Sequence, residues 1–448
     1  SWDTAALFRS WRPDLPLLAE TSGKNAIIIT PSADLDLAVA DLVKSAFGHA
    51  GQKCSAASLA ILVGPVGRSQ RFARQLADAV RSLHVGWPSD PLAEVGPVIE
   101  KPQGKLAWAL NELEGDERWL IEPAVAADDE SGRLWRPGIR VGVQAGSRFH
   151  TEEFFGPVLG IMHAPTLARA VEMQNAVAYG LTAGLHTQNP DDLAFWLDRV
   201  QAGNLYVNRG ITGAIVQRQP FGGWKRSSVG PGAKAGGPNY LIGLGSWRSQ
   251  PGAAASSTLH LRGLDSRITA LIESAQPSLD YESFEWLRRA ALSDALAWDR
   301  EFGQVRDVSR LGIERNLFRY RPLPVEIRAA SDAPLQDLLR TVIAAVRAGA
   351  GFTLSTPVGL PAGVRHALGD LDAAVHLESD EEWMQRMLRR EESVEPGAAP
   401  APRVNRVRLV GPRGAVAALH AVLAAAVDGD PDLAVYDGEV TAAGRIEL

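Results

Sequence analysis

Cys54 is the only cysteine in this 448-residue chain, and it directly follows the glycine turn Gly51-Gln52-Lys53. A lone thiol cannot form an internal disulfide or a multi-cysteine zinc site. Two roles stay open: a small buried hydrophobic residue, because free cysteine is among the most buried residue types, or a nucleophile. A nucleophile needs the thiolate, so positive potential, a base or a helix N-terminus must lie nearby. The residues from Ser55 onward could begin a short helix whose N–H groups face the sulfur.

Acidic, aromatic and glycine residues in three further segments carry groups that could complete a site. Residues 20–25 read Glu-Thr-Ser-Gly-Lys-Asn, residues 152–157 read Glu-Glu-Phe-Phe-Gly-Pro, and residues 220–225 read Pro-Phe-Gly-Gly-Trp-Lys. A carboxylate such as Glu20 can act as a general base on water. Each segment also has a structural interpretation, because Glu20 could cap a turn and residues 152–157 could form one.

Strands and helices alternate around these segments. We expect apolar strands at 26–29, 59–63, 140–143, 155–163 and 204–208, and helices at 35–47, 68–83, 167–175 and 191–202. The helices follow from apolar residues at helical spacing, and the strands from short β-rich apolar runs. This alternation indicates an α/β layer structure.

The last third of the chain has a similar alternation of its own. Helices are expected up to about residue 302 and at 334–347, 381–390 and 415–427, with strands at 325–328, 351–355, 374–377, 407–410 and 433–436. Residues 249–257 read as a linker, and a Pro/Ala stretch covers 395–402. The run Gly-Pro-Arg-Gly at 411–414 follows a strand and precedes a helix. It is not the GxGxxG fingerprint, so it is a weak signal for nucleotide binding.

Composition excludes several classes of function. The net charge of −6 argues against a nucleic-acid surface, which needs clustered Lys and Arg. No apolar run is long enough for a membrane span, and the start is not a signal peptide, so we expect a cytoplasmic protein. The nine histidines show no metal-ligand spacing, and no metal is expected.

The four motif segments, taken together and in order, resemble the aldehyde dehydrogenase superfamily. The sequences of residues 19–25, 48–56 and 211–216 resemble those of its L-glutamate γ-semialdehyde (pyrroline-5-carboxylate) dehydrogenase branch, in particular those of the long bifunctional proline-utilisation members. The resemblance implies NAD-dependent oxidation of L-glutamate γ-semialdehyde to L-glutamate, the second step of proline catabolism. The same resemblance includes the region after residue 258, which is similar to the C-terminal domain of the long members.

The resemblance also implies a role for each matching residue. Cys54 would attack the aldehyde and carry a thioester, and Glu20 would activate the hydrolytic water. For the NAD cofactor, Glu153 would hold the nicotinamide ribose and Phe155 would pack near the ring. The substrate would be bound by Ser55, by the backbone of Gly213 and Ala214, and by Phe221; residues 212–214 could equally be an ordinary loop.

The resemblance further predicts the domain organisation. The expected fold is an α/β aldehyde dehydrogenase catalytic domain, with most of its N-terminal cofactor domain missing, followed by a smaller Rossmann-like domain. The boundaries are 1–13 for the tail of the missing NAD-binding domain, 14–207 for the catalytic domain, 208–248 for a return and oligomerisation segment, 249–257 for the linker and 258–448 for the truncated C-terminal domain.

The chain is expected to be truncated at both ends, so the isolated chain should be inactive or nearly so, and FAD should belong only to a missing upstream proline dehydrogenase domain. The full-length protein is expected to be a homo-oligomer. Two alternatives stay open: an aldehyde dehydrogenase for another substrate, or a non-enzymatic lid or assembly fragment.

Overall fold

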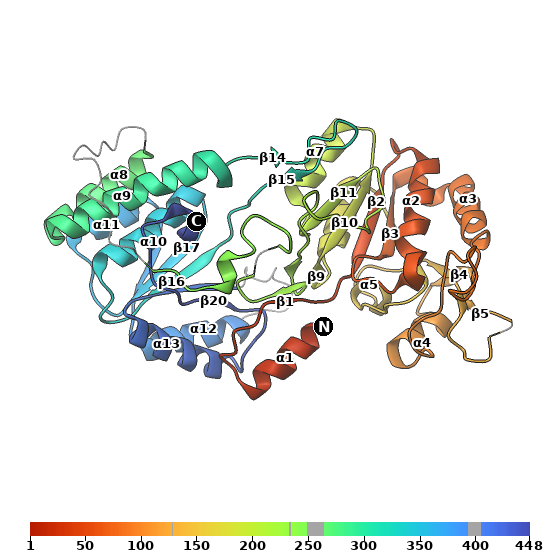
Figure 1. Ribbon diagram of the computed structural model, residues 1–448, viewed down its shortest axis with the longest axis horizontal. Helices are drawn as coiled ribbons and strands as arrows, with labels where there is room; N and C mark the ends of the chain where they lie inside the picture. Colours follow the sequence, from red (N-terminus) through yellow and green to blue (C-terminus); the bar gives the residue numbers. More distant parts are fainter. Residues whose placement is uncertain (128, 233, 249–263, 393–404) are drawn as a thin grey trace. The chain divides into compact units, whose positions relative to one another are not determined.

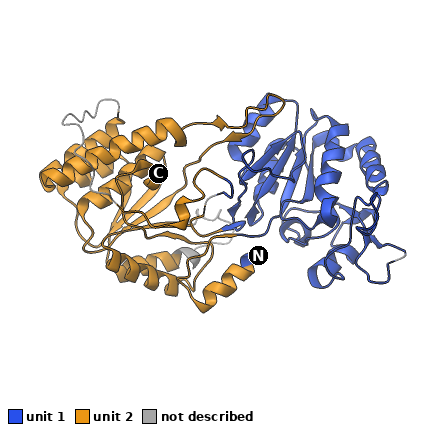
Figure 2. Cartoon of the chain, viewed as in Figure 1, with its two compact units in different colours: residues 1–2, 20–228, 234–236 blue, residues 3–19, 229–233, 237–448 orange. Residues whose placement is uncertain are grey.

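The computed structural model describes residues 1–127, 129–232, 234–248, 264–392 and 405–448. Two compact units make up the chain (Figure 2). Unit 1 contains residues 1–2, 20–228 and 234–236, and unit 2 contains residues 3–19, 229–233 and 237–448. The predicted linker at 249–257, the boundary at residue 258 and the Pro/Ala stretch at 395–402 lie outside the described residues.

Unit 1 is built on a seven-stranded sheet with the strand order β11-β10-β2-β3-β8-β7-β4. Neighbouring strands are parallel except for the antiparallel pair of β4 and β7. The strands are β2 (Asn25–Ile29), β3 (Ala57–Val63), β4 (Arg118–Ile121), β7 (Gly138–Val141), β8 (Val158–Ala164), β10 (Thr182–His186) and β11 (Asn204–Val207). Two-residue strands are β1 (Ala19–Glu20), β5 (Ala124–Val125), β6 (Trp135–Arg136), β9 (Tyr179–Gly180), β12 (Trp224–Lys225) and β13 (Ser228–Val229).

Two helix pairs cover opposite faces of this sheet (Figure 1). One pair is α2 (Leu35–Phe47) with α3 (Gln70–Arg81), and the other is α6 (Leu167–Asn175) with α7 (Pro190–Arg199). Shorter elements are η1 (Gly48–Gly51), η2 (Gly64–Arg68), α4 (Gly104–Asn111) and α5 (Arg148–Thr151). Every residue of β2 is buried, as expected for a central parallel strand that is covered on both faces.

The structure corrects three local predictions in unit 1. No helix follows Ser55, because the chain turns there and enters β3 at Ala57. The strand predicted at 155–163 begins only at Val158, since Phe155 has a left-handed φ of 56° that a strand does not allow. The sequence analysis missed β10, whose central Gly184 weakens the strand pattern. A Cβ at that glycine would lie 2.7 Å from the side chain of Ile211, so close packing excludes a larger residue there.

Unit 2 contains a five-stranded parallel sheet with the order β18-β17-β16-β19-β20. Its strands are β16 (Val325–Ala329), β17 (Phe352–Thr356), β18 (Ala374–Leu377), β19 (Arg406–Val410) and β20 (Ala434–Tyr436). In chain order these are strands 3-2-1-4-5, the arrangement of a doubly wound nucleotide-binding fold. The predicted α/β fold with a Rossmann-like C-terminal part is therefore confirmed.

Helices cover both faces of the second sheet (Figure 1). They are α10 (Leu335–Ala348) and α11 (Ala362–Asp370) on one face, and α12 (Asp380–Glu392) and α13 (Arg413–Ala426) on the other. The outer helices α8 (Ser266–Ala275) and α9 (Tyr281–Ala297) pack on α10 and α11. The remaining elements are α1 (Trp2–Trp11), α14 (Gly444–Glu447), η3 (Ile242–Leu244), η4 (Gln276–Ser278), η5 (Trp298–Phe302), β14 (Arg306–Asp307) and β15 (Leu317–Phe318).

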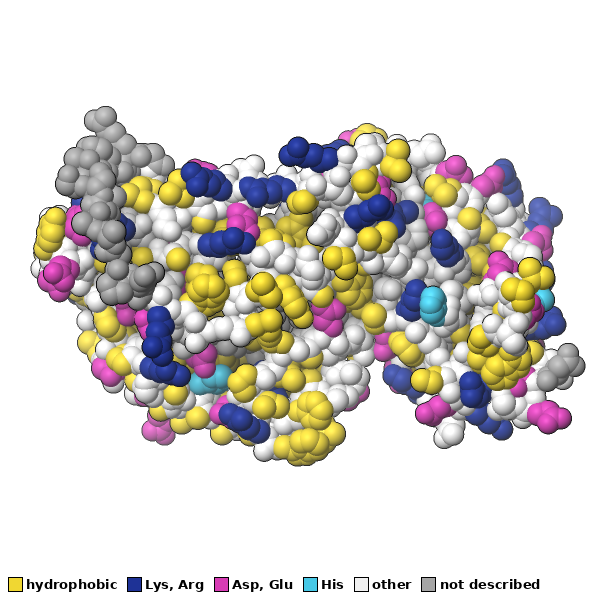
Figure 3. All heavy atoms as spheres, viewed as in Figure 1, with side chains coloured by type: hydrophobic (Ala, Val, Ile, Leu, Met, Phe, Trp, Pro, Cys, Tyr) yellow, Lys and Arg dark blue, Asp and Glu magenta, His cyan; other side chains and the backbone are white. Residues whose placement is uncertain are grey.

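The described surface carries both signs of charge and ordinary apolar groups. On the face drawn in Figure 3, Lys and Arg side chains alternate with Asp and Glu over both units. Among the described residues, no helix has the length and apolar character that a membrane crossing requires.

Candidate active site

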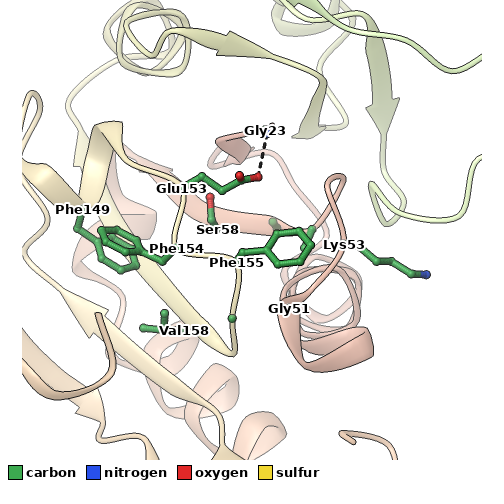
Figure 4. A pocket seen from close by; sticks show the side chains of 12 residues that line it. Gly23, Gly51, Lys53, Ser58, Phe149, Glu153, Phe154, Phe155 and Val158 are labelled. Carbon is green, nitrogen blue, oxygen red and sulfur yellow. Dashed lines mark hydrogen bonds between the residues drawn. The ribbon is translucent and has the colours of Figure 1, made fainter. Parts of the chain in front are cut away.

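Cys54 lies just after a strained turn at the end of α2. In η1, residues 49–51 have φ values of 57°, 53° and 68°, which only glycine adopts readily. Glycine is required at position 51 for a second reason, because a Cβ there would lie 2.2 Å from the carbonyl oxygen of Gly156. The turn therefore packs directly against the segment that contains Glu153 (Figure 4).

The side chain of Asn25 holds the Cys54 loop in place. Its Nδ2 donates to the carbonyl oxygens of Cys54, at 2.7 Å, and Ala56, at 2.9 Å. Its Oδ1 accepts from the main-chain N–H of Thr182 in β10, at 3.0 Å. Asn25 is fully buried at the start of β2, so three otherwise separate segments are tied together at one amide. Sequence reasoning assigned no role to this residue, although it closes the first motif.

Cys54 itself is exposed. Partial burial raises the pKa of its thiol, and the carboxylates of Glu153 and Glu20 raise it further. The main-chain N–H groups of Ser55 and of Cys54 itself act in the opposite direction and lower the pKa of the thiol. The helix expected after Ser55 is absent, so these N–H groups belong to a turn. With two carboxylates beside it, the thiol needs a base to become nucleophilic.

Glu153 and Phe155 lie on the turn that faces the Cys54 loop (Figure 4). Oε1 of Glu153 accepts from the N–H of Gly23 at 2.9 Å. Phe155 is 40% exposed, and its carbonyl oxygen accepts from Nε2 of Gln52 at 3.1 Å. The turn borders a cavity of about 20 Å³, large enough for one water molecule.

Lys24 lies beside the same turn and is a buried lysine, only 3% exposed. Its Nζ lies 4.3 Å from the ring centroid of Phe149 and 5.0 Å from that of Phe154, and these two rings stack on each other. Among the described residues no hydrogen-bond partner reaches this nitrogen. Burial lowers the pKa of Lys24 to about 7, while Glu153 raises it. The sequence analysis included Lys24 only as part of the motif.

Glu20 is the second carboxylate that acts on Cys54, because it raises the pKa of the thiol. Burial raises the pKa of its carboxyl group, and Lys234 and the main-chain N–H of Ala235 lower it. Ala235 pairs in turn with Phe221 through two main-chain hydrogen bonds, Phe221 N–H to Ala235 O at 3.0 Å and the reverse at 2.7 Å. Glu20 and Phe221 are thus connected through one short β-bridge. Lys234 was not identified from the sequence.

The other predicted substrate residues are positioned less directly. Ser55 is buried at 7% exposure, and its carbonyl oxygen accepts from Oγ1 of Thr182 at 3.2 Å. Gly213 and Ala214 lie in the loop after β11; Gly213 has a φ of 81°, and a Cβ added to it would meet open space. The loop begins at Ile211, whose N–H donates to Oγ of Ser45 on α2 at 3.0 Å. The structure brings Glu20 and Glu153 around Cys54, whereas the roles of Ser55, Gly213 and Ala214 stay predictions.

A second, larger cavity of about 530 Å³ lies elsewhere in unit 1, between α3 and strands β7 and β8. Its walls include Phe72, Leu76, Ile161 and Met162, and none of the candidate site residues lines it. Within the described ranges, no three His, Cys, Asp or Glu side chains are grouped as metal ligands would be.

Comparison with known proteins agrees with this arrangement. The model of the aldehyde dehydrogenase family matches residues 13–243. The 1-pyrroline-5-carboxylate dehydrogenases of Geobacillus thermodenitrificans and Bacillus subtilis are each 39% identical, over 227 and 226 residues; the match covers 50% of this chain and 43% of each relative. This chain therefore spans less than half the length of those relatives.

One solved structure matches the whole chain. The structure of Proline Utilization A from Corynebacterium freiburgense is 43% identical and covers 100% of this chain with a TM-score of 0.78, while 40% of that longer protein is matched. Since the family match covers more than half of the 448 residues, this chain belongs to the aldehyde dehydrogenase family.

Proposed function

We propose that this chain carries the catalytic residues of an NAD-dependent L-glutamate γ-semialdehyde dehydrogenase. The observation that supports this most is the convergence of Glu20 and Glu153 on the thiol of Cys54, within a chain that matches Proline Utilization A over its full length. The proposed reaction oxidises the aldehyde to L-glutamate, with water as the source of the second carboxylate oxygen.

The first step is attack of Cys54 on the aldehyde carbon. The proton of the thiol must leave, because only the thiolate is nucleophilic and two carboxylates disfavour that form. Glu20 is the base that suits this step, since burial raises the pKa of its carboxyl group. The main-chain N–H groups of Cys54 and Ser55, which lower the pKa of the thiol, favour the negative charge on the sulfur.

The residues near Glu153 fit the nicotinamide end of a dinucleotide. Glu153 supplies a carboxylate whose Oε1 is already fixed by Gly23, and its acceptors suit ribose hydroxyl groups. Phe155 adds an exposed aromatic face on the same turn. When bound, NAD supplies the hydride acceptor. The acyl group is then bound to the sulfur of Cys54 as a thioester. Glu20 takes a proton from the water that attacks this thioester and releases L-glutamate.

We assign recognition of the substrate's α-carboxylate to Ser55, Gly213 and Ala214, with Phe221 against the aliphatic part. Support comes from the open space around Gly213 and from the link between Phe221 and the Glu20 side of the site. Backbone N–H groups at small residues are suited to bind an anion.

The nucleophile and the base can be tested without cofactor turnover. The 448-residue chain is mixed with p-nitrophenyl acetate, and acylation is followed as release of nitrophenolate. Cys54→Ala should abolish the initial burst of nitrophenolate that accompanies acylation. Glu20→Gln should slow the acylation, because Glu20 accepts the thiol proton, and should then keep the acyl group on the protein, with hydrolysis slower by about 10²- to 10⁴-fold. Lys44→Met, a change on the exposed side of α2, serves as the control and should behave as the wild type. A full burst from Cys54→Ala would contradict the proposed chemistry.

Substrate class is tested by protection of Cys54 against iodoacetamide. L-glutamate γ-semialdehyde should slow alkylation at concentrations where propanal does not, because propanal lacks the carboxylate. A Gly213→Val chain should lose this difference and keep its alkylation rate in the absence of ligand. Equal protection by both aldehydes would favour an aldehyde dehydrogenase for another substrate.

A further inference from the structure

Lys234 is a charged residue to which the proposed reaction assigns no role. Its Nζ donates to the carbonyl oxygens of Gly203 and Gly222, both at 2.7 Å, and to Oδ1 of Asn204 at 2.9 Å. The three acceptors match the three donors of an ammonium group, and all of them are uncharged. The cage therefore fixes the position of the ammonium group, and no carboxylate among the described residues is in direct contact with it.

Glu20 lies beside the same cage, next to Gly222. A Cβ on Gly222 would lie 3.1 Å from Cγ of Lys234 and 3.3 Å from Oε1 of Glu20, so this glycine is enclosed between the two side chains. The glycine is itself held by Asn204, because its N–H donates to Oδ1 of Asn204 at 3.1 Å. Only a residue without a side chain lets the lysine stem and the carboxylate approach each other this closely.

The charges around Glu20 belong to groups that titrate. Lys234 lowers the pKa of Glu20. Burial lowers the pKa of Lys234 to about 8, and Glu20 opposes this effect. The third group is Cys54, whose pKa Glu20 raises. A positive charge behind Glu20 therefore favours the carboxylate form, which burial alone would disfavour.

We propose that Lys234 is a positioning residue for Glu20: its caged ammonium group keeps the carboxylate ionised and oriented toward the acyl group on Cys54. This inference rests on the proposed function, because it assigns Glu20 the role of base in thioester hydrolysis. A merely structural Lys234 would join the loops at Gly203 and Gly222 and would have no influence on the protonation of Glu20.

The pH profile of deacylation separates these two roles. The 448-residue chain is acylated at Cys54 with p-nitrophenyl acetate, and loss of the acetyl group is followed by mass spectrometry between pH 5 and pH 9. At low pH Glu20 is protonated and deacylation slows, which gives the rate profile an acid limb. In Lys234→Met this limb should move to higher pH, since Glu20 loses the charge that favours its ionised form. Below the limb, deacylation should be slower than in the wild type by about tenfold, the effect of one unit of pKa. Above the limb the two rates should converge.

Two further variants make the result specific. Lys234→Arg keeps the charge and should keep the acid limb near that of the wild type, and Lys44→Met removes an exposed lysine and should change nothing. Circular dichroism checks the fold; if Lys234→Met does not fold, Lys234→Gln, which retains an amide donor for the cage, replaces it. Deacylation that is slowed equally at every pH, with an unmoved limb, would overturn the inference.

The outcome also separates this inference from the proposed function. Glu20→Gln should remove the acid limb. If it does, and Lys234→Met leaves the limb in place, the positioning role is wrong and the base is not. If Glu20→Gln deacylates with the rate and pH profile of the wild type, Glu20 is not the base and both proposals are wrong.

Discussion

Replacement of Asn25 by leucine should remove the hydrogen bonds that attach the Cys54 loop to the sheet. The amide of Asn25 makes three hydrogen bonds, to Cys54 O at 2.7 Å, to Ala56 O at 2.9 Å and from Thr182 N at 3.0 Å. Leucine has a similar volume, so the change removes the bonds without creating a large cavity. The three main-chain groups are left in a buried place without their side-chain partner.

The expected loss follows from these three bonds. A net contribution of about 1 kcal/mol per hydrogen bond, with an added cost for buried groups left unpaired, amounts to about 3–5 kcal/mol in the free energy of unfolding. In a unit of roughly 200 residues this corresponds to a fall in melting temperature of about 10 °C. The loss is a large fraction of the stability of an ordinary domain.

Urea denaturation followed by circular dichroism measures the stability, and the rate of Cys54 alkylation by iodoacetamide reports on the loop. Ser58→Ala is the matched control, because its Oγ lies 3.4 Å from Asn25 O and this long contact should contribute less than about 0.5 kcal/mol. The reasoning is wrong if Asn25→Leu costs less than about 1 kcal/mol and leaves the alkylation rate unchanged.

Three further predictions concern other parts of the molecule. Gly51→Ala should destabilise the chain by about 2 kcal/mol or more and alter Cys54 alkylation, because its Cβ would lie 2.2 Å from a carbonyl oxygen at φ 68°; Gly48→Ala, with open space around it, should be nearly neutral in the same urea titration. Lys24 has a pKa of about 7 in the folded chain and 10.5 as its ordinary value, so unfolding takes up a proton between these values and wild-type stability gains up to about 1.4 kcal/mol per pH unit from pH 7 to 10.5. Lys24→Met should lack this gain. The prediction is contradicted if the free energy of unfolding of the wild type, minus that of Lys24→Met, does not rise with pH. In unit 2, Arg340→Met should cost about 3–5 kcal/mol, because it leaves the fully buried Asp294 without its two hydrogen bonds of 2.7 Å, whereas Arg340→Met combined with Asp294→Leu should recover much of this loss.

The chain's local patterns predict most of its strands and helices. Residues 26–29 are apolar, with β-branched isoleucines at 27–29, and they lie in the buried strand β2. Residues 35–47 have apolar side chains at helical spacing, and they form α2 with Asp34 as its N-cap. The alternation in the last third likewise predicts the Rossmann-like sheet of unit 2. Prediction fails where packing overrides pattern: Gly184 sits in the middle of β10 because Ile211 leaves no room for a side chain.

Residue types and motif order also identify Cys54, Glu20, Glu153 and Phe155 as the group to consider, because these motifs resemble one family. Tertiary structure alone decides what surrounds them. The carboxylates of Glu153 and Glu20 raise the pKa of the Cys54 thiol, and the main-chain N–H groups that lower it belong to a turn and not to a helix. Behind Glu20, Lys234 is caged by oxygens from loops that are distant from Glu20 in the sequence. Electrostatic effects on a pKa depend on distance and burial in three dimensions, and a one-dimensional pattern contains neither quantity.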